Sequence, residues 1–331
     1  MPAPPLERRF PNISPKAYEH PADRAATAAL ASIPFLETVV RRLTEFQYER
    51  ALRQLYLGNA IRVGPDQLPE MWASHLDVIE VLDLSSRPQL YLARGVWANA
   101  LTIGTNEPMV IVDSALVSLL DPEQLRTVLA HEGAHILSDH LLYRTALEVI
   151  LSLSRLDRLP FFAGLPLMAI RSALLEWARA TELTCDRAAA LAVGDPRLVC
   201  RVLMTLAAGA QAEALDLDAF LAQAAEYEDW DSPFDRARRF FVEVGVTHAF
   251  PVRRVSELMR WVRSGEWERI VGGEYATRDQ PVDARQEAGD AVAFYADRFR
   301  GFFQDAGESV QAAGEQLADW LRGGGGGPGR G

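Results

Sequence analysis

Apolar residues recur at the spacing of an α-helix along most of this chain. In residues 21–57, apolar positions three and four apart form a stripe, which predicts helix. The stripe consists of Leu36, Val39, Val40, Leu43 and Phe46. Gly58 then ends the pattern, because glycine readily adopts the backbone conformation that follows a helix. The pattern predicts a short strand at residues 60–63 and a further helix at residues 68–82.

Apart from the short strand at 60–63, the helical spacing changes in one region. Residues 89–92, 98–103 and 109–112 are short, β-prone runs that glycine or asparagine residues separate. From Ser114 onward nearly every segment returns to helical spacing. The pattern therefore predicts an α+β fold that is predominantly helical, with a small sheet placed before the long helical region.

Residues 121–142 follow directly and carry strong signals for the start of a helix. Asp121 is a good N-cap, Pro122 stands where its missing N–H costs nothing, and Gln124 can complete a capping box. Apolar residues then follow at helical spacing. They are Leu125, Val128, Leu129 and Leu137. We expect a capped and mostly buried helix here.

Further helices are predicted along the rest of the chain. They cover residues 144–155, 171–193, a segment from 196 onward, 233–244, 251–262 and an amphipathic stretch at 283–322. The apolar run 159–170 contains two prolines and is interpreted as a buried turn between core helices; the alternative is shallow insertion at a membrane interface. The final glycine-rich residues 323–331 are expected to be disordered.

Composition narrows the class of protein. The 331 residues are 49% hydrophobic and 24% charged, which is typical of a soluble globular protein. The net charge of −11 argues against a nucleic-acid partner and against tight electrostatic binding to anionic lipid. Cys185 and Cys200 are too few for a disulfide framework. We predict no signal peptide and no transmembrane helix.

The candidate chemistry begins with two histidines in the helix predicted at residues 121–142. His131 and His135 are one helical turn apart, so their side chains lie on one face while Glu132 flanks them. Two imidazoles on one face can hold one metal ion, and an adjacent glutamate can act as a base. The spacing predicts a metal site with hydrolytic chemistry.

A second helix supplies further candidates. Catalytic zinc takes three protein ligands and keeps one open position, and two histidines with one glutamate form an established set. Glu182 fits as the third ligand. Asp186 is placed one turn further on to accept a hydrogen bond from a ligand histidine; the alternative is a salt bridge with a nearby arginine. Cys185 is interpreted as a small buried helix residue, with approach to the metal as the alternative.

At residues 90–258 the sequence resembles the HtpX and CAAX-prenyl-protease type of gluzincin zinc metallopeptidases. The resemblance rests on NALTIG (99–104), IVDSALVSLL (111–120), LRTVLAHEGAHILSDH, EWARATELTCDRAAALAVGD and, more weakly, THAFPVRRVSEL. It implies that His131, His135 and Glu182 bind one Zn²⁺ per chain, that Glu132 is the general base, and that Asp186 orients a ligand. The further histidine of the family matches His140, which lies on another helix face and is not counted as a ligand.

The last motif departs from the family pattern, because Ala249 and Phe250 stand where prolines are usual. His248 matches a histidine that faces the site in relatives, and Arg254 matches an arginine. His248 is therefore a candidate to stabilise the oxyanion, and a plain loop histidine is the alternative. Asn99 and Ala100 open a strand whose edge would pair with an extended peptide; for Asn99 the alternative is a turn residue.

The resemblance implies a zinc-dependent metalloendopeptidase, and the predicted edge strand suits extended polypeptides. Because relatives of the HtpX type carry transmembrane helices and none is predicted here, we expect the bacterial cytoplasm as its location, with peripheral membrane contact as a further option. The alternatives are a zinc-stabilised peptide-binding or chaperone-like protein without proteolysis, and hydrolysis of a small amide. We expect residues 1–85 to form an N-terminal arm and helices packed on the catalytic domain, residues 86–265 to form the peptidase domain, and residues 266–331 to hold the amphipathic helix and tail.

Overall fold

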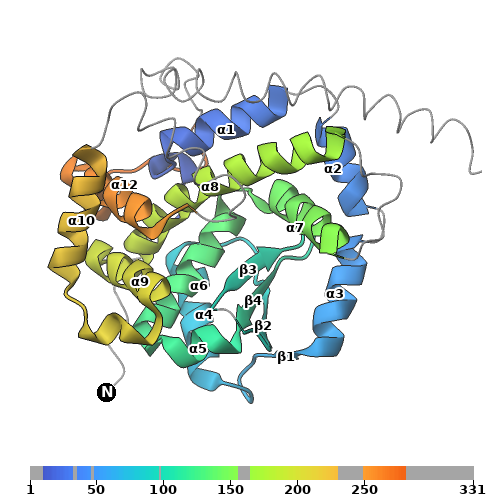
Figure 1. Ribbon diagram of the computed structural model, residues 1–331, viewed down its shortest axis with the longest axis horizontal. Coiled ribbons are helices and arrows are strands. Elements are labelled where there is room, and N and C mark those ends of the chain that lie inside the picture. The colour runs from blue at the N-terminus through green and yellow to red at the C-terminus, as the bar shows by residue number, and fades with distance from the viewer. Residues whose placement is uncertain are drawn as a thin grey trace, which may run out of the picture.

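A computed structural model describes residues 10–32, 36–45, 48–96, 98–155, 165–229 and 249–280. Helices surround a small sheet (Figure 1), which confirms the predicted α+β class with helix predominating. The segments predicted at 233–244, 283–322 and 323–331 lie outside the described residues.

The sheet has four strands in the order β1-β2-β4-β3. They are β1 (Ala60–Arg62), β2 (Gln89–Ala93), β3 (Ala100–Ile103) and β4 (Met109–Asp113). β2 and β4 pair in parallel, whereas β1 and β3 pair antiparallel to their neighbours. Because β3 lies at the end of this order, it is an edge strand, as the sequence predicted.

The helices lie largely within the predicted segments, but the segment 21–57 holds three helices, the last of which runs past Gly58, and the helix predicted at 121–142 ends at Leu137. Before the sheet they are α1 (Pro21–Ser32), α2 (Leu36–Glu45), α3 (Tyr48–Asn59) and α4 (Pro69–Val81). After it come α5 (Ser114–Leu119), α6 (Pro122–Leu137), α7 (Leu141–Arg155), α8 (Leu165–Val193), α9 (Pro196–Ala208), α10 (Leu217–Asp229), α12 (Pro251–Arg263) and α13 (Glu266–Val271). Short 3₁₀ turns occur at Pro15–Ala17 and Gly209–Ala214.

The start of α8 also differs from the prediction. The run 159–170 was interpreted as a turn, but α8 already begins at Leu165 and is 29 residues long. Pro166 is compatible with this start, because proline in the first turn removes an N–H that has no partner within the helix. The turn interpretation is therefore wrong for residues 165–170, and residues 156–164 lie outside the described ranges.

Two apolar cores meet on α8. The larger one packs α4, α6, α9 and α12 with one face of the sheet against the C-terminal half of α8. The smaller one packs α1, α2 and α7 against its N-terminal half. Tyr91, Ile103, Met109 and Ile111 pack on the opposite face of the sheet, next to α3. The long helix α8 therefore links both cores through the middle of the molecule.

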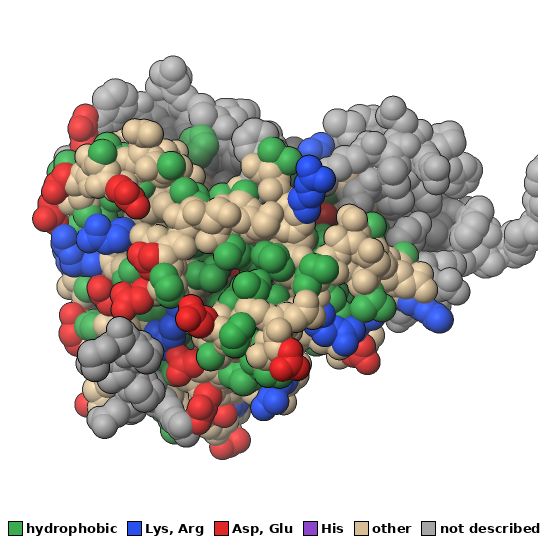
Figure 2. All heavy atoms as spheres, turned by 90° about the horizontal axis from the view of Figure 1, so that it is seen from below, with side chains coloured by type: hydrophobic (Ala, Val, Ile, Leu, Met, Phe, Trp, Pro, Cys, Tyr) green, Lys and Arg blue, Asp and Glu red, His purple; other side chains and the backbone are tan. Residues whose placement is uncertain are grey.

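The face seen in Figure 2 carries apolar side chains near its centre and acidic side chains around them. Large exposed apolar residues of the chain include Leu55, Leu57, Ile61, Leu68, Val96, Leu206 and Leu215. Scattered exposed apolar side chains are normal on protein surfaces.

Candidate metal centre

Helix α6 begins at the capping box that the sequence predicted. Asp121 Oδ1 accepts hydrogen bonds from the backbone N–H groups of Glu123 at 2.9 Å and Gln124 at 2.8 Å, while Gln124 Oε1 accepts one from the N–H of Asp121 at 3.2 Å. These bonds satisfy N–H groups that have no partner within the helix. The start of α6 is thus fixed, and with it the direction of its histidines.

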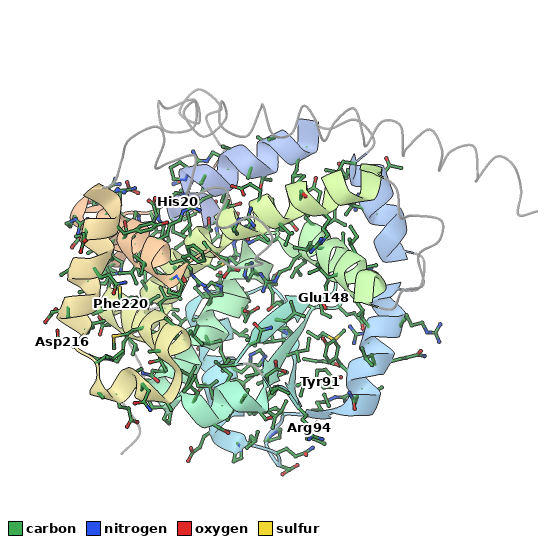
Figure 3. All side chains as sticks on the ribbon, viewed as in Figure 1. His20, Tyr91, Arg94, Glu148, Asp216 and Phe220 are labelled. Carbon is green, nitrogen blue, oxygen red and sulfur yellow. The ribbon has the colours of Figure 1, made fainter. Side chains whose placement is uncertain are left out.

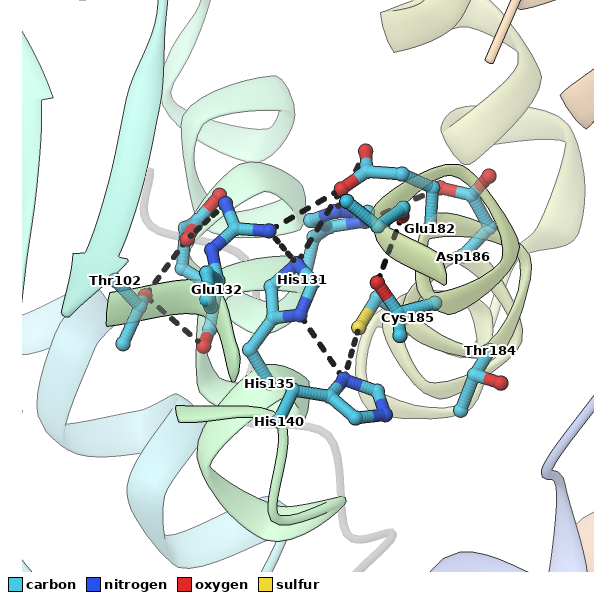
Figure 4. Close-up of polar contacts among 12 residues, drawn as sticks. Thr102, His131, Glu132, His135, His140, Glu182, Thr184, Cys185 and Asp186 are labelled. Atoms are coloured by element: carbon cyan, nitrogen blue, oxygen red, sulfur yellow. Dashed lines mark hydrogen bonds and ion pairs between the residues drawn. The ribbon is translucent and has the colours of Figure 1, made fainter. Parts of the chain in front are cut away.

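His131 and His135 lie on one face of α6, and Glu182 of α8 faces them (Figure 4). Glu182 Oε2 is 3.4 Å from His131 Nε2, and Glu182 Oε1 is 3.5 Å from His135 Nε2. All three side chains are buried. The structure therefore brings together the three residues that the sequence analysis proposed as ligands.

Asp186 approaches the other nitrogen of His131. The Nδ1 of His131 donates to Asp186 Oδ1 at 3.1 Å, which leaves Nε2 directed at Glu182. Arg254 of α12 holds the same carboxylate, with Nε 2.7 Å from Oδ2 and Nη2 2.6 Å from Oδ1. Burial alone would raise the pKa of Asp186, but Arg254 and His131 outweigh it and hold this pKa below its usual value.

The two histidines have opposite pKa shifts. Burial, together with the nearby Arg144 guanidinium, holds the pKa of His135 well below its usual value. For His131, burial lowers the pKa, but the carboxylates of Glu182 and Asp186 raise it more, to about 9. His135 is therefore neutral at pH 7, the form in which an imidazole binds a metal.

Glu132 lies beside this cluster and is fixed by a residue that sequence reasoning missed. Thr102 of β3 donates its hydroxyl to Glu132 Oε2 at 2.7 Å, and it is also 3.2 Å from the Glu132 backbone oxygen. A threonine inside a β-prone run gives no sign of this contact, because it depends on how the strand packs against α6. The glutamate is consequently held close to the histidines.

Arg144, at the start of α7, is a second residue that sequence reasoning missed. Its Nη1 donates to His135 Nε2 at 2.7 Å and to Glu182 Oε1 at 3.3 Å, and its Nη2 lies 3.5 Å from Glu132 Oε2. A guanidinium thus faces the same nitrogen and oxygen atoms that a metal ion would take. This group of buried acceptors accommodates a cation.

Cys185 also approaches the histidines. One potential ligand atom each from His131, His135 and Cys185 lies within 4.8 Å of the others. The Cys185 Sγ is 3.9 Å from His140 Nδ1. Imidazole, carboxylate and thiolate are the donors that zinc takes in proteins, so the residues present fit a zinc ion.

A cavity of about 260 Å³ opens beside the cluster. Its lining includes His131, Glu132 and Glu182 of the cluster, together with Asn99 and Ala100 at the start of β3. Apolar side chains from α5 and α9 complete its wall. His248 lies outside the described residues, whereas Arg254 from the same motif reaches the cavity.

Two buried histidines and a glutamate on one helix, with a carboxylate from a second helix, define the class of metal-dependent hydrolases. The sequence model of Peptidase family M48 matches residues 67–262, and the chain belongs to this family. Membership implies metal-dependent proteolysis, usually with zinc.

Named relatives agree with this family. The plastoglobule-localized metallopeptidase 48 of the Arabidopsis thaliana chloroplast is 33% identical over 267 residues, which cover 79% of this chain and 77% of the relative. A protease HtpX homolog of Helicobacter acinonychis is 36% identical over 63 residues, 18% of this chain and 20% of the relative. Another of Persephonella marina is 37% identical over 82 residues, 24% and 28% respectively. No solved structure matches the chain.

The HtpX-type resemblance stated from the sequence is therefore confirmed. Among the described residues, no helix combines the length and the apolar character that crossing a bilayer requires.

Proposed function

We propose that this protein is a zinc-dependent endopeptidase that holds one Zn²⁺ per chain with His131, His135 and Glu182. The observation that supports this best is the convergence of the three side chains from two helices, at 3.4 and 3.5 Å between the glutamate oxygens and the histidine nitrogens. Asp186, bound to His131 on its far side, keeps that ring directed at the site.

When bound, zinc polarises the scissile carbonyl and makes a water molecule easier to deprotonate at neutral pH. In our proposal Glu132 takes the proton of this water and passes it to the leaving amine. The 2.7 Å bond from Thr102 to Glu132 Oε2 limits rotation of the carboxylate, so that the base stays beside the reacting atoms. His248 remains our candidate donor to the oxyanion.

We propose that the substrate is a polypeptide bound in extended form along β3. Support comes from the edge position of β3 and from Asn99 and Ala100 at the cavity wall. Backbone hydrogen bonds to an edge strand hold a peptide largely irrespective of its sequence. The proposed substrates are therefore unfolded or extended segments, and no nucleic acid is expected to bind.

The proposed location is the bacterial cytoplasm, with peripheral contact to a membrane or lipid surface as the alternative. The net charge of −11 supports the first option, while a relative named for the plastoglobule supports the second. Cell fractionation distinguishes them: recovery with the lipid fraction after a high-salt wash would contradict the cytoplasmic assignment.

The first prediction tests metal and chemistry together. The Glu132→Gln variant should bind zinc as the wild type does, because the ligands are unchanged, and should lose cleavage of an unfolded protein by at least about 10²-fold, as expected for a general base. Metal content is measured by elemental analysis and cleavage by gel electrophoresis.

Unchanged cleavage by Glu132→Gln would refute the general-base role. A zinc-loaded wild type that binds the unfolded protein without cutting it would support the alternative of a peptide-binding or chaperone-like protein. The intact Glu132, fixed by Thr102 in the site, favours hydrolysis over that alternative.

A further inference from the structure

The two histidines of α6 are oriented from different parts of the chain. The Nδ1 of His131 bonds directly to the carboxylate of Asp186. The Nδ1 of His135 instead lies 3.1 Å from His140 Nδ1, and His140 Nε2 lies 3.0 Å from Asp23 Oδ2. His135 thus reaches a carboxylate through a second imidazole, and that carboxylate belongs to α1.

The protons along this chain of contacts can be placed by elementary chemistry. Arg144 donates to His135 Nε2, so this nitrogen carries the lone pair and Nδ1 carries the hydrogen. His135 Nδ1 then donates to His140 Nδ1, which must accept. His140 keeps its hydrogen on Nε2 and donates it to Asp23, which as a carboxylate can only accept.

This order directs the His135 Nε2 lone pair into the site. Were the His140 hydrogen on Nδ1 instead, it would face the Nδ1–H of His135, and the imidazole would have to rotate or change tautomer. Cys185 also lies near His140 Nδ1, but at 3.9 Å it is further away than His135. Asp23 therefore selects the tautomer of His140, and His140 selects that of His135.

Asp23 is itself firmly held. It is 1% exposed, and it accepts hydrogen bonds from Thr184 of α8 at 2.6 Å and from Thr27 at 3.2 Å. The backbone N–H of His20, which Figure 3 labels just before α1, donates to the same Thr184 hydroxyl at 3.0 Å. These bonds attach the start of α1 to the helix that carries Glu182.

We propose that Asp23 is a positioning residue of the metal centre, acting through His140 to fix the tautomer and ring orientation of His135. The proposal rests on the proposed zinc site. It makes α1 part of the metal-binding machinery, although α1 lies before the region 67–262 that the family model matches.

The experiment measures the zinc dissociation constant of the full chain by competition with a chromophoric chelator. Asp23→Ala should weaken zinc binding about 10- to 100-fold, the usual effect of removing a carboxylate that orients a ligand histidine. Asp23→Asn keeps an oxygen that accepts from His140 but loses the charge, so it should weaken binding less. It also preserves the volume of the side chain should the alanine variant fail to fold.

Glu257→Ala is a matched control. Glu257 of α12 is 3.3 Å from Nε2 of His20, so this variant also removes a carboxylate from a buried histidine near α1, but His20 bonds to Thr184 through its backbone N–H and not through the ring that Glu257 holds. Its zinc affinity should equal that of the wild type. An equal loss in Glu257→Ala and Asp23→Ala would mean that the effect is general loosening, and would overturn the proposal.

A double-mutant cycle with His140→Ala separates positioning from mere structural support. If Asp23 acts through His140, Asp23→Ala should cause almost no further loss of zinc affinity in the His140→Ala background. Additive losses, or normal affinity in Asp23→Ala and Asp23→Asn, would overturn the proposal. A wild type that binds no zinc would refute the proposed function itself, and this inference with it.

Discussion

At the scale of single residues, two side chains of α8, Glu182 and Cys185, each present a metal-binding atom to the two histidines of α6. Glu182 makes ion-pair contacts with His131 and His135, whereas one ligand atom each from Cys185 and the same two histidines lie within 4.8 Å of one another. Burial raises the pKa of the Cys185 thiol well above its usual value, and the nearby Glu182 carboxylate adds to this. The thiol would have to lose its proton to bind a metal, whereas both carboxylate oxygens of Glu182 already approach a histidine nitrogen, so we favour Glu182.

Cobalt substitution tests this choice. The Co²⁺-loaded wild type should lack the intense near-ultraviolet band of a thiolate–cobalt bond, and Cys185→Ser should leave its spectrum and metal content unchanged. Glu182→Ala should lose at least about tenfold in metal affinity, because a ligand is removed. A thiolate band that disappears in Cys185→Ser would instead assign Cys185 as the third ligand.

The candidate metal ligands on each helix could be predicted from the sequence, but the contacts that distant segments make with them could not. The pair His131 and His135 follows from helical spacing alone, and Glu182 from the donor set that zinc prefers. Thr102, Arg144 and Asp23 reach the site from β3, α7 and α1. Their roles depend on tertiary packing, for which a single sequence offers no spacing rule.

At the scale of elements, α4 and α6 approach closely because of a glycine within the histidine motif. A Cβ placed on Gly133 would lie 3.2 Å from Val78 Cγ1, tighter than ordinary contact. Glycine lowers helix stability by about 1 kcal/mol relative to alanine, yet here it lets α4 pack directly on the back of the metal-binding helix. The sequence predicted both helices but not this contact.

Helix α4 also carries a buried histidine that makes stability depend on pH. His75 is 2% exposed and bonds through Nε2 to the Pro88 oxygen at 2.9 Å. Burial, aided by the Arg87 charge, lowers its pKa below the usual value. Between this lowered pKa and about 6.5 the unfolded chain binds more protons than the folded one, so acid favours unfolding.

We therefore expect the free energy of unfolding to fall as pH drops below about 6.5, with His75 contributing at most about 1.4 kcal/mol per pH unit. His75→Gln retains an N–H donor for Pro88 but cannot gain a proton. The free energy of unfolding of this variant should therefore fall less than that of the wild type between pH 7.5 and pH 5.5. Urea unfolding of both proteins at pH 7.5 and 5.5, with a chelator present, measures the difference. Identical pH dependence would show that His75 titrates equally in both states.

At the scale of the whole molecule, the candidate metal centre lies where the two cores meet. His131 and His135 come from α6 in the larger core, Arg144 from α7 in the smaller one, and Glu182 from α8, which belongs to both. A metal ion at this junction would tie α6 to α8 directly. The division into two cores depends on tertiary packing and could not be predicted from the sequence. The start of α8 was also expected six residues too late.

Removal of zinc should consequently destabilise the entire fold. At a thousandfold excess of free zinc over its dissociation constant, binding contributes about 4 kcal/mol, so a chelator should lower Tm by roughly 10 °C. Differential scanning calorimetry measures this shift. Glu182→Ala, with its weakened site, is the control and should respond much less; an unchanged Tm for the wild type would contradict a stabilising metal at the junction.

The edge position of β3 has a consequence for unfolded molecules of the protein itself. Recognition by backbone pairing does not distinguish a foreign extended segment from an unfolded molecule of the same chain. If substrates bind along β3 as we propose, copies that lose their metal and unfold would become substrates for those that keep it. Under limiting zinc, the population would remove its own metal-free members, and its concentration would follow the supply of metal.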